Sequence, residues 1–125
     1  MSIVNMMLDD QSEFDLLLKT ENGYTGFHLA CISGQTNIVE ILIKKSESTD
    51  LDITAKDSWG CTGFHSACSA GQTNIVEMLL HKSEYLKLDL TATDNSGSTG
   101  YQLAFTWEKW DVIDMIKHKM PSLIL

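Results

Sequence analysis

The sequence has little positive charge, with nine basic residues among 125, and it also contains only one proline and three cysteines. The nine basic residues stand against 17 aspartates and glutamates, which gives a formal net charge of −8. An acidic surface repels phosphate backbones and anionic lipids, so neither nucleic acid nor a membrane surface is an expected partner. No apolar run approaches the roughly 18 residues that a membrane-spanning helix needs.

The cysteines and the first residues of the chain indicate a reducing compartment. Three is an odd number of cysteines, and Cys31 and Cys68 lie one repeat apart, as described below, so we interpret them as packing residues and not as a pair. Residues 1–8 lack the basic segment of a secretory signal and run directly into two aspartates. We therefore expect a cytoplasmic location, with the nucleus as a second intracellular alternative.

The sequence repeats itself with a fixed period of 37 residues. Gly-Tyr-Thr-Gly-Phe-His at 23–28 returns as Gly-Cys-Thr-Gly-Phe-His at 60–65 and as Gly-Ser-Thr-Gly-Tyr-Gln at 97–102. Further along, Gly-Gln-Thr-Asn-Ile-Val-Glu occurs identically at 34–40 and 71–77. Repeats of this length form stacked supersecondary units, which present an extended surface and not a closed pocket. The period alone therefore favours a binding function.

Each repeat is expected to begin with a turn and a short helix. Clusters of Asp, Asn, Ser and Gly form the turn, and helices are predicted over 25–32 and 62–69. Thr25 and Thr62 are suited to the helix N-terminus, because their hydroxyls can accept a hydrogen bond from an unpaired backbone N–H.

A second helix is expected after the glycines at 34 and 71, beginning near Thr36 and Thr73. Its apolar residues recur at helical spacing and define one face, which in the first copy comprises Ile38, Val39, Leu42 and Ile43. The segments 51–53 and 88–90 alternate apolar and acidic residues, which predicts short extended segments between the repeats.

These repeats resemble the ankyrin repeat. Thr-Gly-Phe-His-x-Ala-Cys is similar to that family's Thr-Pro-Leu-His-x-Ala signature, and Gly-Gln-Thr-Asn-Ile-Val-Glu-x-Leu is similar to its second-helix motif. The resemblance covers about residues 14–119. It implies an all-α solenoid of stacked helix-turn-helix units with short β-hairpin-like fingers. It also implies a non-catalytic protein–protein interaction module that binds through a concave surface of fingers and first helices.

The chain departs from the family pattern at three places. Its repeat is four residues longer than the family's 33, which predicts a second helix longer by about one turn. Gly26, Gly63 and Gly100 replace the usual proline, and the preset φ of that proline is lost. Glu108 replaces the glycine between the two helices of the third copy, so we expect these helices to meet differently.

We predict a single domain over 1–125, with a partial N-terminal unit at 1–20 and units at 21–57, 58–94 and 95–125. An alternative is that the chain is a fragment, or a spacer or regulatory segment, of a longer ankyrin-repeat array. The partial first unit would then leave apolar residues around Phe27 and Leu29 open to self-association.

No metal, cofactor or catalytic site is expected. His28 with Cys31, and His65 with Cys68, have the i, i+3 spacing of soft metal ligands. The resemblance implies instead that each histidine hydrogen-bonds within the turn near the motif threonine, and that each cysteine packs like a small alanine. The sequence also lacks a nucleophile with a base and an orienting group, so we predict that the protein is not an enzyme.

Residues that differ between the repeats are the expected partner-binding positions, because stacked units must keep their packing residues but not their exposed ones. They are Glu21, Asn22, Tyr24, Ile32, Ser33, Ser58, Trp59, Cys61, Ser69, Ala70, Asn95, Ser96, Ser98, Thr106 and Trp107.

Trp59 is the first candidate, since tryptophan is enriched at interface hot spots, although its ring could instead cover the adjacent finger. Trp107 is the second, with packing against Trp110 as its alternative. The acidic composition favours a protein partner with a basic or mixed surface.

Overall fold

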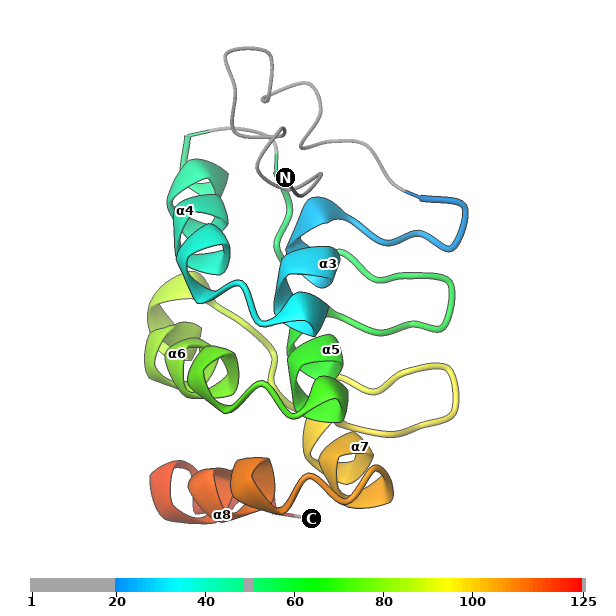
Figure 1. Ribbon diagram of the computed structural model, residues 1–125, viewed down its shortest axis with the longest axis vertical. Coiled ribbons are helices and arrows are strands. Elements are labelled where there is room, and N and C mark those ends of the chain that lie inside the picture. The colour runs from blue at the N-terminus through cyan, green and yellow to red at the C-terminus, as the bar shows by residue number, and fades with distance from the viewer. Residues whose placement is uncertain (1–19, 49–50, 125) are drawn as a thin grey trace.

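The computed structural model describes residues 20–48 and 51–124, which form three stacked helix pairs (Figure 1). The inner row contains α3 (Gly26–Ser33), α5 (Gly63–Ala70) and α7 (Gly100–Thr106). The outer row contains α4 (Thr36–Ser46), α6 (Thr73–Leu86) and α8 (Trp110–Lys119), followed by the short 3₁₀ helix η1 (Pro121–Leu123). Loops project from the inner row, on the side away from the outer helices (Figure 1). We call each helix pair, with the loop before it, a unit.

The inner helices begin with the same reciprocal cap. The N-cap hydroxyl accepts a hydrogen bond from the backbone N–H three residues later, and the side chain at that third position accepts one from the backbone N–H of the cap residue. The caps are Thr25, Thr62 and Thr99. This arrangement satisfies two backbone N–H groups that a helix start otherwise leaves unpaired. The predicted helix starts are therefore confirmed, with the threonine just outside the helix.

The turn between the two helices is similar in all three units, although α7 ends one residue earlier than α3 and α5 do. Gly34 and Gly71 adopt left-handed φ values of 74°, and Glu108 adopts a left-handed φ of 57° at the equivalent place. The next residue then donates to a carbonyl five residues back, as from Lys109 N to Ala104 O at 2.8 Å. The expectation that the third helix pair meets differently is wrong, because Glu108 accepts the strained backbone conformation that glycine adopts freely.

The core lies between the two rows of helices and between successive units. The predicted apolar face of the second helix is confirmed, since Ile38, Val39, Leu42 and Ile43 are all buried. Phe27 and Phe64 occupy equivalent places, and each ring lies against the first-helix glycine of the next unit, Gly63 or Gly100. Tyr101 is buried at the corresponding position of the third unit. Apolar burial between neighbours is what stabilises a repeat stack.

The two cysteines of the repeat have the predicted packing role. Cys31 and Cys68 are buried, and their sulfurs lie 3.2 Å from where a Cβ would stand on Gly63 and Gly100. Burial raises the pKa of both thiols far above the usual value, because a thiolate loses its hydration there.

The connections between units differ from the predicted extended segments. Leu51, Ile53 and Leu90 are buried as expected, but residues 53–54 and 90–91 form turns. The Asp89 carboxylate stabilises its turn by accepting hydrogen bonds from Thr91 N at 3.0 Å and Thr91 Oγ1 at 2.7 Å. No β-strand occurs within 20–48 or 51–124, so the fingers in this part of the chain are loops and not strand pairs.

The outer helices have unequal lengths of 11, 14 and 10 residues for α4, α6 and α8. The helix extension predicted for both repeats is present in α6, which continues to Leu86, but not in α4, which ends at Ser46. The predicted partial unit at 1–20 lies outside the described residues, apart from Thr20. Of the apolar residues that were expected to be open to self-association, Phe27 is buried and Leu29 is half-buried. None of the described helices has the length and apolar character needed to cross a bilayer.

Candidate protein-binding surface

The projecting loops, which we call fingers, comprise residues 20–25, 57–62 and 94–99. In the second finger, Asp57 Oδ1 accepts hydrogen bonds from the backbone N–H groups of Trp59 and Cys61, both at 2.9 Å. Asp94 forms the same two bonds with the third finger at 2.9 Å. In the first finger, the hydroxyl of Thr20 replaces the carboxylate and accepts from Tyr24 N at 3.1 Å. Each finger is therefore fixed by the side chain of its first residue.

Neighbouring fingers are hydrogen-bonded to each other. Ser58 N donates to Asn22 O at 2.8 Å, and Asn95 N donates to Trp59 O at 2.9 Å. The Asn95 side chain also donates to Ser58 O at 3.0 Å. Several residues predicted to bind a partner thus also connect the fingers, a role that the sequence did not indicate.

A histidine joins each of the first two inner helices to the following finger. The His28 Nδ1 atom accepts from Thr25 N at 3.1 Å, so the proton lies on Nε2, which donates to Cys61 O at 2.8 Å. His65 forms the same bonds with Thr62 N and Ser98 O, both at 3.1 Å. The predicted bond within the turn is confirmed, and the bond to the next unit is an additional one.

These histidines are structural in character. Burial lowers the pKa of His65, since the charged imidazolium would lose its hydration. Both ring nitrogens of His28 and His65 have hydrogen-bond partners within the protein. Across 20–48 and 51–124, no three His, Cys, Asp or Glu side chains are grouped so that they could hold a metal ion.

Trp59 and Tyr24 form an aromatic pair across the first two fingers. Their ring centroids are 5.9 Å apart with an interplanar angle of 35°, and the Tyr24 ring lies equally close to His28. Trp59 nevertheless remains 52% exposed. The ring therefore covers the neighbouring finger with one part, as the alternative interpretation expected, and presents the rest to solvent; its contact with a partner stays a prediction.

The far ends of the inner helices carry the other predicted positions. Ile32 and Trp107 are exposed, and the side chain of Gln72 donates to Ile32 O at 2.8 Å. Trp110 packs edge-on against Phe105, with ring centroids 5.5 Å apart. The predicted alternative of a Trp107–Trp110 pair is thus not what the structure shows.

Most of the predicted partner-binding positions are accessible. Ten are exposed, namely Glu21, Asn22, Ile32, Ser33, Ser58, Trp59, Asn95, Ser96, Thr106 and Trp107. Five are half-buried, namely Tyr24, Cys61, Ser69, Ala70 and Ser98. We call this set, on the fingers and inner helices, the finger surface.

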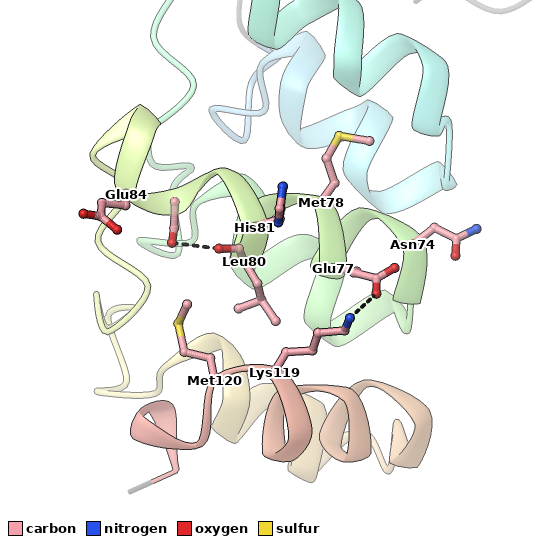
Figure 2. Close-up of a pocket in the computed structure, with 9 residues that line it drawn as sticks. Asn74, Glu77, Met78, Leu80, His81, Glu84, Lys119 and Met120 are labelled. Atoms are coloured by element: carbon pink, nitrogen blue, oxygen red, sulfur yellow. Dashed lines mark hydrogen bonds and ion pairs between the residues drawn. The ribbon is translucent and has the colours of Figure 1, made fainter.

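A groove that sequence analysis missed lies between the outer helices α6 and α8, with a volume of about 640 Å³ (Figure 2). Leu80 and Glu77 of α6 point toward α8, whereas Met78 and His81 point toward α4 (Figure 2). Lys119 Nζ lies 3.1 Å from Glu77 Oε2 across the groove. Both side chains are about half exposed, so solvent screens the pair and its contribution to stability is small.

Comparison with protein-family models matches residues 1–108 to ankyrin repeats in three copies. The chain belongs to the ankyrin repeat family. Ankyrin repeats are generally protein–protein interaction modules, and the family is typically non-catalytic. No curated protein matches this ankyrin-repeat chain.

Proposed function

We propose that this ankyrin-repeat protein binds a protein partner through its finger surface, without catalysing a reaction. Exposed Trp59 carries the proposal, because a large aromatic ring that is half accessible in a fixed loop is typical of interface hot spots. The Trp59 backbone is fixed, because its N–H donates to the Asp57 carboxylate and its carbonyl accepts from Asn95 N. Little conformational entropy would therefore be lost on binding.

The distribution of recurring and differing residues along the repeat supports the same conclusion. Recurring residues of the inner helices serve as caps, as Thr25, Thr62 and Thr99 do, or are buried, as Ala30, Ala67 and Ala104 are, whereas most of the differing residues of the finger surface are exposed. A partner bound along this surface would contact three units at once. Recognition by a stack of this kind depends on such extended surfaces.

The chemistry of the finger surface supports binding without catalysis. Cys61 is half-buried, whereas Cys31 and Cys68 are buried. Partial burial, together with the charges of Asp57 and Asp94, raises the pKa of the Cys61 thiol to about 11. A thiol with that pKa is protonated at neutral pH and is a poor nucleophile. The histidines use both ring nitrogens for structure. Free, buried Cys31 and Cys68 also agree with an intracellular location, which is part of the proposal.

The test is a Trp59→Ala variant assayed against a partner captured from cell lysate and then purified. We expect binding to weaken by more than about 1 kcal/mol, which is about a fivefold rise in Kd by titration calorimetry. Trp110→Ala is the matched control, because Trp110 is also 52% exposed but begins an outer helix. Unchanged affinity of a folded Trp59→Ala protein would reject the proposal.

A further inference from the structure

The described lysines are confined to one side of the molecule, whereas acidic residues occur on both sides. The fingers and inner helices, over 20–33, 57–70 and 94–107, contain three acidic residues, Glu21, Asp57 and Asp94, and no lysine. The chain has no arginine at all. The described lysines lie on the outer helices or in the connecting segments, at Lys44, Lys45, Lys56, Lys82, Lys87, Lys109, Lys117 and Lys119.

The aspartates of the fingers form no ion pair with a lysine of the described residues, although Lys56 directly precedes Asp57. Asp57 and Asp94 use their carboxylates to accept backbone N–H groups, and neither forms an ion pair with a described residue. Burial raises the pKa of Tyr24 and of Cys61, and the negative charge of Asp57 adds to both shifts, as that of Asp94 does for Cys61. The field at this side of the molecule therefore favours cations.

An aromatic platform lies within the same field. The exposed ring of Trp59 is supported by Tyr24 at 5.9 Å, and Trp59 N is bonded to the Asp57 carboxylate at 2.9 Å. The face of an indole attracts a cation through its quadrupole, and tryptophan is the strongest of the aromatic residues in this respect. A neighbouring carboxylate adds a Coulomb attraction of the same sign.

We infer that the partner presents a segment rich in lysine or arginine to the finger surface, and that one of its cationic side chains lies over the ring of Trp59. This inference rests on the proposed function and names the chemistry of the partner. The α6–α8 groove is less suited to a cationic segment, because Lys119 already occupies the carboxylate of Glu77 there.

The test is a display library of random 12-residue peptides selected on the whole protein. We expect the selected peptides to carry a net positive charge relative to the unselected library. Their Kd should rise about tenfold for Ser96→Lys, which adds a cation to the third finger, and about tenfold for Trp59→Leu, which keeps an apolar group but removes the ring. Ser122→Lys is the matched control, since Ser122 is exposed in η1 and the same charge is added away from the fingers.

The outcomes separate this inference from the proposed function. Neutral or acidic selected peptides that lose binding in Trp59→Ala would reject the cationic partner and keep the finger surface as the binding site. Cationic peptides that are weakened equally by Ser96→Lys and Ser122→Lys would also reject it, because binding would follow overall charge. If no finger variant changes the Kd of the selected peptides, both the cationic partner and the finger surface as the binding site would be rejected. Each variant is first required to show the wild-type circular dichroism spectrum and melting transition.

Discussion

The ring of Phe27 lies so close to Gly63 in the next unit that no side chain would fit between them. A Cβ on Gly63 would overlap the Phe27 ring and stand 3.2 Å from Cys31 Sγ. Phe64 and Gly100 repeat this relationship, with two ring carbons at 2.7 Å from the equivalent point. The glycine and the aromatic ring therefore depend on each other, which explains why the motif proline of the family is replaced here together with its leucine.

Gly63→Ala is expected to destabilise the protein by about 1–3 kcal/mol, the usual cost of overpacking a well-packed core. Helix propensity alone favours alanine over glycine by about 1 kcal/mol, so a loss of stability would identify the contact with Phe27 as its cause. Urea unfolding followed by circular dichroism measures the change.

A double-mutant cycle tests that cause. Phe27→Leu should recover at least about 1 kcal/mol of the Gly63→Ala loss, because contacting residues show coupling of about 0.5–3 kcal/mol. Additive effects of the two substitutions would show that the ring is not what excludes the methyl group.

His65 makes stability depend on pH. Its pKa is lowered from the ordinary 6.5 by burial, so below that pH the unfolded chain binds a proton that the folded protein does not. Stability is therefore expected to fall as the pH decreases from about 6.5. Urea unfolding at pH 7 and pH 5 should show this loss.

His65→Gln is the comparison variant, because the third unit already uses glutamine in this cap. Gln102 Oε1 accepts from Thr99 N at 2.9 Å, as the histidine ring does elsewhere. The variant should lose less stability than the wild type between pH 7 and pH 5. Hydrogen bonds from Thr91 lower the pKa of Asp89 below 3.8. Asp89 therefore contributes to the pH dependence of stability only under more acidic conditions. Identical pH slopes would contradict the role of His65.

Glu108→Gly should stabilise the protein by about 0.5–1 kcal/mol, because a left-handed φ costs a residue with a Cβ about 1–2 kcal/mol and glycine recovers part of that. Glu108 has a φ of 57° where the other units have Gly34 and Gly71. Thermal melting measures the gain. Glu108→Ala keeps the Cβ and should give none, so an equal gain from alanine would refute the explanation.

The Lys119–Glu77 ion pair should contribute little. With both side chains about half exposed, Lys119→Met is expected to change stability by less than about 1 kcal/mol, and less still at high salt. A larger loss that persists in 1 M NaCl would mean that the groove between α6 and α8 depends on this pair.

Much of the fold was predictable because the repeat places local signals at the helix ends. Thr25 and Thr62, together with the glycines at 34 and 71, mark positions where the backbone itself needs a cap or a left-handed turn. The third turn was less predictable, since Glu108 has no local preference for the left-handed φ that it adopts at the place of Gly34 and Gly71.

The surface was less predictable because its contacts join different units. Exposure of Trp59 follows from its place in a turn, but its contact with Tyr24 depends on the spacing between fingers. The same holds for the histidine bonds, which connect residues 33 positions apart. The α6–α8 groove is lined by residues of two different units, so no single repeat contains it.

The histidine bonds give the stack a direction. His28 donates to the second finger and His65 to the third, whereas the backbone N–H of Ser58 donates back to the first finger. Truncation before the third finger would therefore remove the acceptor of a histidine side chain, whereas removal of the first unit would remove the acceptor of a finger backbone N–H and the Phe27 ring that packs on Gly63. Shortening the protein from its two ends is therefore not equivalent.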